Sequence, residues 1–411
     1  MKFRFAILFY IISLSAFAHA DTLTFQVNYP TFVHPNRNDI VNESALHSFF
    51  ERLLNLKSGE NNKVNILHIG DSHIQPDYIT AVMRTNLQKA FGNAGRGLII
   101  PIKVANSNEA FNYKTSSNLP WNRKRLVYTN DSSFVYGIGG HTIRTDNDSA
   151  YIKINTFNYA PLNYAFTKFS VFHLSDSTAF TMLLTDTADT FLELLKTEVE
   201  IPNFSTAVLP SETNEVTLRL LKADTLQKQA TIFGFLAEND SAGVLVHAVG
   251  VNGAEAFQFV QAKHFAEQAK VLSPDLIIVS LGTNEAQRRP FDRALTEARL
   301  DSLIQILRTT KPGTAILLTT PPDSYYSRKY YNPSIASMHE IIVTYASNNN
   351  LAVWDLFSMA GGYKSCYQWK KYGYMRRDGV HFTRAGYELQ GSLLYQAFVN
   401  AFNQYATSRS K

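Results

Sequence analysis

The sequence predicts an α/β fold, a doubly wound parallel sheet of five strands that carries an inserted β-sandwich. Three observations support this prediction. Short apolar runs alternate with segments of helical spacing near both ends of the chain. Residues 106–243 largely lose the helical period and show two-residue alternation instead. A single strand–helix unit precedes this middle segment. Its strand can join a sheet only by pairing with the strands that follow the middle segment.

The first part of the chain is predicted to hold one helix and then one strand–helix unit. Residues 42–57 place five apolar side chains on one helix face. Residues 64–69 form a short apolar run closed by Gly70, as in a buried parallel strand. Residues 76–91 follow as a helix with Pro76 near its first turn.

The middle segment is predicted to be an antiparallel β-sandwich. Ile152 and Ile154 alternate around Lys153, and a second alternating stretch runs over residues 216–220. A surface loop tolerates such an insertion because closing a longer loop adds little entropic cost. The alternative is a two-domain chain divided near residue 243, which would leave the first strand–helix unit without a partner.

After the insert, the alternation of strands and helices resumes. Four further strands and four further helices complete a sheet in which each crossover is helical. The strands are expected at residues 244–249, 276–281, 315–319 and 351–356, and the helices at residues 254–272, 292–310, 333–348 and 383–402.

The N-terminus has the layout of a secretory signal peptide. Lys2 and Arg4 precede an apolar run over residues 5–18 that closes on Ala18-His19-Ala20. The run is shorter than the roughly 20 residues of a membrane-spanning helix. We therefore expect cleavage after Ala20, a periplasmic protein and no membrane insertion. The expected divisions are a signal peptide (1–20), an α/β domain in two parts (21–105 and 244–411) and the insert (106–243).

Charge and composition exclude several classes of function. The formal charge of +5 falls to +3 once Lys2 and Arg4 are removed, a mild bias toward anionic partners. No basic run with interleaved aromatic residues indicates nucleic-acid binding. Cys366 is the only cysteine, so no disulfide can form within the chain. The 11 histidines include no His-x-x-x-His pair, and no metal site is predicted.

Polar groups follow the predicted strands where they end. The carboxyl ends of parallel strands meet at one edge of the sheet, so these groups should surround one crevice. They are Gly70-Asp71-Ser72-His73 after the first strand, Gly250-Val251-Asn252-Gly253-Ala254 after the second, Gly282-Thr283-Asn284-Glu285 after the third, and Asp378-Gly379-Val380-His381-Phe382 before the last helix.

These residue types suit acyl transfer. A serine hydroxyl such as that of Ser72 becomes a good nucleophile when an imidazole accepts its proton and a carboxylate orients that imidazole. Asp378 and His381 are three residues apart, so one tight turn can place both side chains on the same side. Asp71 is expected to order the nucleophile turn or to tune these groups.

The tetrahedral intermediate of acyl transfer also needs hydrogen-bond donors directed at its oxyanion. The candidates are the backbone N–H groups of Ser72 and Gly253 and the side-chain amide of Asn284. Ser72 is also expected to open a helix, where unpaired N–H groups favour negative charge.

The four motifs, in this order, resemble the sequence blocks of the SGNH, or GDSL-type, hydrolases. The resemblance covers residues 60–105 and 244–405 and implies a flavodoxin-like sheet and a serine esterase without a cofactor. It implies Ser72 as nucleophile, Gly253 and Asn284 as oxyanion donors, and Asp378 and His381 as the rest of a catalytic triad. The motifs over residues 70–73, 250–254 and 282–286 are similar to those of bacterial peptidoglycan O-acetylesterases, in which a domain like a carbohydrate-binding module is inserted.

This resemblance leads us to expect an acetylesterase whose partner is an acetylated glycan, with peptidoglycan favoured. The alternatives are an O-acetyltransferase, an esterase of another acetylated polysaccharide, and a glycan-binding protein without catalysis. His73, Asn252 and Glu285 are candidate substrate-binding residues. The tyrosines Tyr325, Tyr326, Tyr330 and Tyr331 follow the fourth strand and are expected either to stack on sugar rings or to pack a loop. The sequence leaves the oligomeric state open.

Overall fold

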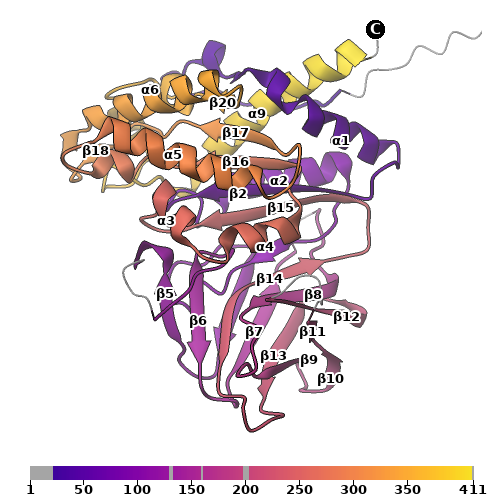
Figure 1. Cartoon of the computed structure of the whole chain (residues 1–411). Helices are drawn as coiled ribbons and strands as arrows, with labels where there is room; N and C mark the ends of the chain where they lie inside the picture. The colour runs from indigo at the N-terminus through magenta and orange to yellow at the C-terminus, as the bar shows by residue number, and fades with distance from the viewer. Residues whose placement is uncertain (1–21, 129–132, 159–160, 198–202, 410–411) are drawn as a thin grey trace, which may run out of the picture.

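The computed structural model describes residues 22–128, 133–158, 161–197 and 203–409. The predicted signal peptide lies outside these residues. In Figure 1 an α/β part lies above a β-rich part. None of the helices in the described ranges is both long and apolar enough to cross a membrane.

The α/β part is built on a mixed sheet of six strands. Five strands pair in parallel in the order β15-β2-β16-β17-β20, which is the 2-1-3-4-5 order of flavodoxin-like sheets. An antiparallel edge strand, which the sequence analysis did not predict, pairs with β20. The strands are β1 (Ile40–Val41), β2 (Lys63–Gly70), β15 (Gly243–Gly250), β16 (Leu276–Ser280), β17 (Ala315–Thr319) and β20 (Ala352–Trp354).

Helices cover both faces of this sheet, as expected of a doubly wound fold (Figure 1). The apolar side chains of α1, α2 and α9 pack on one face, and those of α3 to α6 pack on the other. The helices are α1 (His47–Lys57), α2 (Tyr78–Phe91), α3 (Ala256–Gln261), α4 (Phe265–Leu272), α5 (Arg293–Arg308), α6 (Pro333–Asn348), α7 (Leu356–Met359), α8 (Cys366–Lys371) and α9 (Arg384–Arg409). Single 3₁₀ turns are η1 (Pro35–Arg37), η2 (Glu43–Leu46), η3 (Leu126–Tyr128) and η4 (Glu285–Gln287).

Three expected helices differ in the structure. The helix expected over residues 254–272 is two helices, because Ala262 adopts an extended backbone between α3 and α4. Apolar residues continue through this break, so spacing alone does not show it. The helix expected over residues 42–57 begins as the 3₁₀ turn η2. The last helix continues to Arg409, beyond the expected end at residue 402.

The β-rich part contains two antiparallel sheets whose buried side chains share one hydrophobic cluster. One sheet has the order β10-β9-β13-β7-β4, and the other has β11-β12-β8-β14-β6-β5 with β3 beside β14. The limits of the inserted domain remain a prediction, and β3 lies before the expected boundary. The strands are β3 (Gly97–Ile99), β4 (Tyr113–Ser117), β5 (Asn122–Arg125), β6 (His141–Thr145), β7 (Tyr151–Thr156), β8 (Phe166–His173), β9 (Thr181–Thr185), β10 (Phe191–Leu194), β11 (Lys196–Thr197), β12 (Phe204–Thr213), β13 (Glu215–Leu221) and β14 (Ala230–Glu238).

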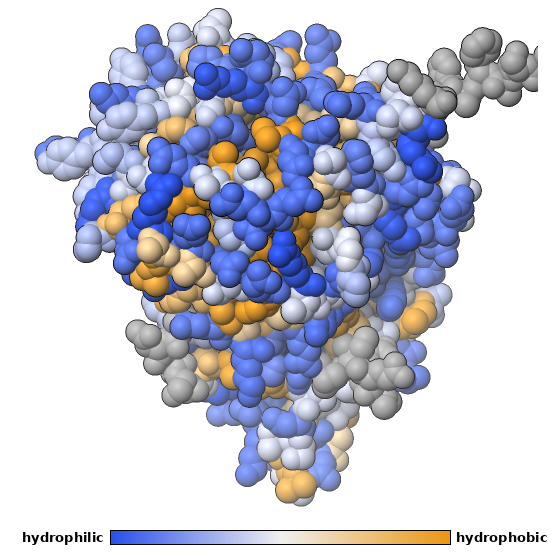
Figure 2. Space-filling view, turned by 45° about the horizontal axis from the view of Figure 1, so that its top comes forward, coloured by the Kyte–Doolittle hydropathy of each residue, from blue (hydrophilic) through white to orange (hydrophobic). Residues whose placement is uncertain are grey.

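The surface is mostly hydrophilic on the face shown in Figure 2, where hydrophobic residues gather in narrow gaps between polar ones. A small antiparallel hairpin stands apart from the main sheets, at the left of the α/β part in Figure 1. Its strands are β18 (Tyr325–Tyr326) and β19 (Tyr330–Tyr331).

Candidate active site

Ser72 lies in a turn at the carboxyl end of β2. The hydroxyl Oγ of Ser72 is 2.9 Å from Nε2 of His381, so it can donate its proton to the imidazole. The expectation that Ser72 opens a helix is wrong. The turn continues to Pro76, and α2 begins only at Tyr78. The positive end of α2 therefore does not begin at the nucleophile.

Asp378 and His381 lie on one tight turn before α9. Nδ1 of His381 is 2.9 Å from Oδ2 of Asp378, so Nδ1–H donates to the carboxylate and Nε2 is free to accept the serine proton. Oδ1 of Asp378 accepts hydrogen bonds from the backbone N–H groups of Val380 and His381. Burial acts to raise the pKa of Asp378, but these bonds and the imidazole hold it below its ordinary value. The carboxylate is thus ionised at neutral pH.

The three expected oxyanion donors line the same cleft as Ser72 and His381. Within the described chain, the backbone N–H groups of Ser72 and Gly253 donate to no protein acceptor. Gly253 has φ = +85°, a left-handed conformation that glycine adopts without steric cost. Nδ2 of Asn284 donates to the carbonyl of Ala254 at 2.9 Å, which fixes the orientation of its amide.

Asn284→Ala should lower kcat on a small acetyl ester by about 10²- to 10³-fold, because one donor to the oxyanion is lost. KM should change much less, since the donor acts mainly in the transition state. Kinetics on 4-nitrophenyl acetate measure both constants, and a melting curve checks that loss of the bond to Ala254 has not unfolded the protein. A kcat within threefold of wild type would remove Asn284 from the oxyanion site.

Asp71 is a buried residue that stabilises the turn carrying Ser72. Its side chain is 1% exposed, Oδ1 accepts from the backbone N–H of His73 at 2.9 Å, and Oδ2 lies 3.4 Å from Nδ2 of Asn284. Burial raises the pKa of Asp71 to about 6, although its hydrogen bonds and His381 act in the opposite direction. Asp71 thereby connects the loops that carry Ser72 and Asn284.

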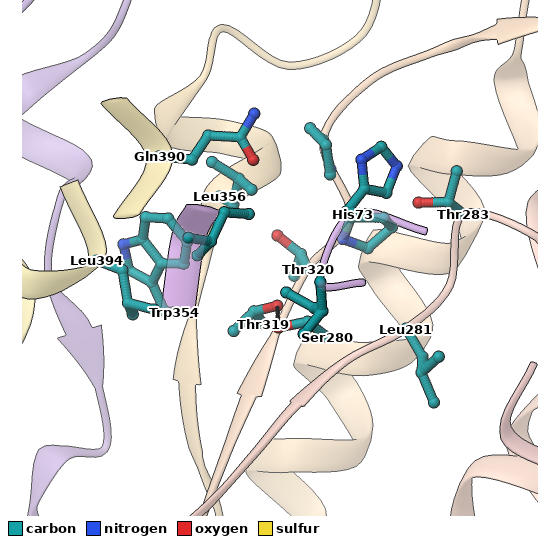
Figure 3. Close-up of a pocket in the computed structure, with 14 residues that line it drawn as sticks. His73, Ser280, Leu281, Thr283, Thr319, Thr320, Trp354, Leu356, Gln390 and Leu394 are labelled. Carbon is teal, nitrogen blue, oxygen red and sulfur yellow. Dashed lines mark hydrogen bonds between the residues drawn. The ribbon is translucent and has the colours of Figure 1, made fainter. Parts of the chain in front are cut away.

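The structure does not bring His73 into the cleft. His73 is 5% exposed and contacts Tyr387, whose hydroxyl is 3.1 Å from Nδ1. Figure 3 shows His73 on one side of an internal cavity of about 30 Å³, with Gln390 and Trp354 on the other. Burial lowers the pKa of His73 to about 3, so the ring is neutral. His73 contacts Tyr387 but does not itself line the cleft, so the prediction that His73 binds substrate gains no support from the structure.

Glu285 is likewise placed away from the cleft. It is 3% exposed, and Oε1 accepts a hydrogen bond from the backbone N–H of Ala256 at 2.9 Å. Oε2 is buried and has no hydrogen-bond partner in the described residues. Burial raises the pKa of Glu285 to about 8, so this carboxyl is protonated at neutral pH. Glu285 connects η4 to the start of α3, beneath the Asn284 loop.

The raised pKa of Glu285 predicts a loss of stability as pH rises. Between about pH 4.5 and pH 8 the folded state keeps a proton that the unfolded state has released, so the free energy of unfolding falls over this interval. The side chain of Glu285→Gln cannot titrate. The free energy of unfolding of this variant, relative to that of the wild type, should therefore rise by at least about 1.4 kcal/mol between pH 5 and pH 8. Urea unfolding at several pH values measures the two curves, and parallel curves would contradict the prediction.

The cleft around Ser72 has a volume of about 590 Å³, and residues from both parts of the chain line it. Of the three expected substrate-binding residues, only Asn252 lies in it. Its backbone N–H donates to Oε1 of Gln75 at 2.8 Å. Sequence reasoning did not place in the site Pro76, Tyr78, Arg376 and Tyr387, which lie a few residues outside the motifs, or Asn108 and Glu109, which are distant from them in sequence. The lining residues are Ser72, Gln75, Pro76, Tyr78, Asn108, Glu109, Asn252, Gly253, Asn284, Arg376, His381 and Tyr387.

Metal ligands do not gather in the described part of the chain. No group of three or more histidine, cysteine, aspartate or glutamate side chains is placed to hold a metal ion there. The chemistry that this site can perform with its own residues is proton transfer from a hydroxyl to an imidazole, beside donors that can stabilise an anion.

Comparisons with known proteins agree with this geometry. The sequence profile of the GDSL-like Lipase/Acylhydrolase family matches residues 228–389. No curated protein sequence matches the chain significantly. Among solved structures, one described as a peptidoglycan O-acetylesterase in action superposes with a TM-score of 0.73 at 19% identity, over 90% of this chain and 99% of that one.

Two other structures match only part of the chain, with TM-scores of 0.30. A lipase/acylhydrolase from Enterococcus faecalis is 23% identical over 38% of this chain and 77% of its own. A GDSL-like lipase from Bacteroides thetaiotaomicron is 20% identical over 38% of this chain and 76% of its own. The profile match over residues 228–389 and the fold shared over nearly the whole chain support the resemblance to the GDSL-type (SGNH) hydrolases and an activity as a carboxylic ester hydrolase.

Proposed function

We propose that this enzyme works in the periplasm and removes O-acetyl groups from a glycan of the cell envelope. Peptidoglycan is the favoured substrate. The observation that carries the proposal is the hydrogen-bonded chain from Ser72 through His381 to Asp378, at the floor of a polar cleft. Ester cleavage through an acyl-enzyme requires a nucleophile, a base and a carboxylate that orients the base, placed next to one another in this way.

In the proposed reaction, Oγ of Ser72 attacks the acetyl carbonyl carbon while Nε2 of His381 takes the hydroxyl proton. The oxyanion is stabilised by the N–H groups of Ser72 and Gly253 and by the amide of Asn284. His381 then protonates the sugar oxygen, and the sugar leaves as an alcohol. Water attacks the acetyl-serine with His381 again as base, and acetate and free Ser72 are released.

Two features support a glycan as the substrate. The cleft is lined mainly by polar groups from the β-rich part and the α/β part, such as Asn108, Glu109 and Asn252, which suit a substrate with many hydroxyl groups. The structure that matches nearly the whole chain is described as a peptidoglycan O-acetylesterase. A predicted signal peptide over residues 1–20 would deliver the enzyme to such a substrate.

The proposal is tested by measuring acetate released from O-acetylated peptidoglycan and from acetylated xylan. We expect the larger kcat/KM on peptidoglycan, and a preference for xylan would overturn that assignment. The same reactions are repeated with an acetyl donor and a de-acetylated glycan acceptor. Predominant transfer to the acceptor, with little free acetate, would mean an O-acetyltransferase instead of an esterase, because a sugar hydroxyl would then intercept the acetyl-enzyme.

A further inference from the structure

Two segments of the α/β part have an unusual composition. Residues 325–331 and 363–377 together contain eight tyrosines, seven lysines or arginines and no aspartate or glutamate. The whole chain has a net charge of +5, so the chain without these seven cations would be at −2. The excess of positive over negative charge therefore comes from these 22 residues, which we call the tyrosine–lysine patch.

The two segments form one surface although they are distant in sequence. The hairpin of β18 and β19 stacks Tyr325 on Tyr331, with ring centroids 5.3 Å apart. Tyr331 also meets Tyr363 edge-on at 6.2 Å, and Nζ of Lys370 lies 5.5 Å from the centre of the Tyr325 ring. In Figure 1 the hairpin is at the left of the α/β part, where the parallel strands end.

The rings of the patch are open to solvent. Five tyrosines expose between 38% and 59% of their surface, the other three tyrosines of the two segments are half-buried, and Trp369 and Met375 are buried. Exposed tyrosine rings are a feature of binding surfaces, since each offers a flat apolar face with a polar tip. The five are Tyr330, Tyr331, Tyr363, Tyr367 and Tyr372.

The cations of the patch lack acidic partners. All seven are exposed, and none forms an ion pair with a carboxylate in the described residues. All four lysines instead lie over tyrosine rings at 5.2 to 5.6 Å, an arrangement that leaves the ammonium group able to bind an anion. In three of them, Lys329, Lys364 and Lys371, the ring belongs to the adjacent residue in the sequence.

The patch leads directly into the cleft. The backbone N–H of Tyr325 donates to the carbonyl of Gly379, between Asp378 and His381, at 2.8 Å. Nζ of Lys370 donates to the carbonyl of Arg377 at 3.1 Å. Arg376, within the second segment, lines the cleft. A polymer bound on the patch would thus continue past Ser72.

We propose that the tyrosine–lysine patch binds a carboxylate-bearing glycan strand and holds it along the cleft while Ser72 attacks an acetyl group on it. Tyrosine rings stack on the apolar faces of sugars, and lysine and arginine bind carboxylates. An anionic bilayer fits less well, because membrane-binding surfaces insert exposed leucine, phenylalanine or tryptophan, whereas the exposed rings here are all tyrosine. This inference rests on the proposed function and extends the substrate from an acetyl ester to an anionic polymer.

The test measures binding without turnover. Full-length Ser72→Ala protein is sedimented with insoluble peptidoglycan sacculi, alone and with Lys329→Gln/Lys364→Gln/Lys371→Gln. The matched control is Lys89→Gln/Lys263→Gln/Lys270→Gln, which removes the same charge from exposed lysines outside the patch. Melting curves check folding. Vesicles of phosphatidylglycerol and phosphatidylcholine replace the sacculi in a parallel series.

We expect the patch variant to bind sacculi about tenfold more weakly at low salt and the control to bind within twofold of its parent, since only the former loses direct contacts. The difference should shrink as salt screens the charges. Equal binding by the two triple variants would overturn the proposal, as would stronger binding of the parent to vesicles than to sacculi. Acetate release is measured separately, so failure of the esterase assignment would be seen independently of this result.

Discussion

Ser72→Ala should lower kcat on 4-nitrophenyl acetate by about 10⁵- to 10⁶-fold, the size of loss seen when a triad nucleophile is removed. The reason is that no acetyl-enzyme can form without Oγ, which lies 2.9 Å from Nε2 of His381. The melting temperature should change little. The Ser72 hydroxyl is only part-buried, and its side-chain hydrogen bond is the one to the imidazole of His381. Rates are compared at high enzyme concentration so that a residual activity is measurable.

The double variant Ser72→Ala/His381→Ala provides the control. If the serine and the imidazole act as one unit, kcat of the double variant should lie within a few fold of kcat of Ser72→Ala. The second substitution then removes a base that has no hydroxyl left to deprotonate. Mass spectrometry should also find an acetyl adduct on acid-quenched wild type and none on Ser72→Ala. Wild-type-like turnover by Ser72→Ala would remove Ser72 from the mechanism.

The sheet was predictable where its strands are buried apolar runs between helices. The strand from Lys63 to Gly70 and its parallel neighbours are apolar runs with a polar turn at each end, and these signals are local. The edge strand β1 and the hairpin of β18 and β19 have strands of two residues each, too short for any period. Their pairing depends on contacts with distant residues, which spacing along the chain does not reveal.

The candidate site divides in the same way. Ser72, Asn284 and the Asp378–His381 pair follow predicted strands or precede a predicted helix, so topology alone brings them to one edge. His73 and Glu285 directly follow two of these residues in sequence, yet both are buried away from the cleft. Neighbouring side chains on a tight turn point in different directions, and the backbone dihedrals that decide this are not visible in a motif.

Asp77 illustrates what sequence reasoning missed altogether. It has φ = +64° just before α2 and binds two buried arginines, Arg84 through both carboxylate oxygens at 2.7 and 3.1 Å and Arg96 at 2.9 Å. Asn112, from the start of the β-rich part, donates to the same carboxylate at 2.8 Å. Burial acts to raise the pKa of Asp77, but the two guanidinium groups hold it below its ordinary value.

Asp77→Ala should therefore lower the free energy of unfolding by about 3 to 5 kcal/mol, the cost of leaving buried charges without their partner. Arg84 and Arg96 are fully buried in the folded protein, so removal of the carboxylate leaves two buried cations without their acidic partner. Because the pKa of Asp77 is depressed, its stabilising effect is present above the pKa of the unfolded carboxyl and is lost as pH falls through the folded value. Urea unfolding at pH 7 measures the loss.

Asp189→Ala is the matched control. Asp189 also has a positive φ, +63°, and also pairs with an arginine, Arg219, but its side chain is 62% exposed. Both substitutions place alanine in the same strained backbone conformation, so the difference between them isolates the burial of the ion pair. Exposed pairs contribute about 0 to 1 kcal/mol, and Asp189→Ala should be correspondingly mild. If the two variants lost equal stability, backbone strain and not the buried carboxylate would account for the effect at Asp77.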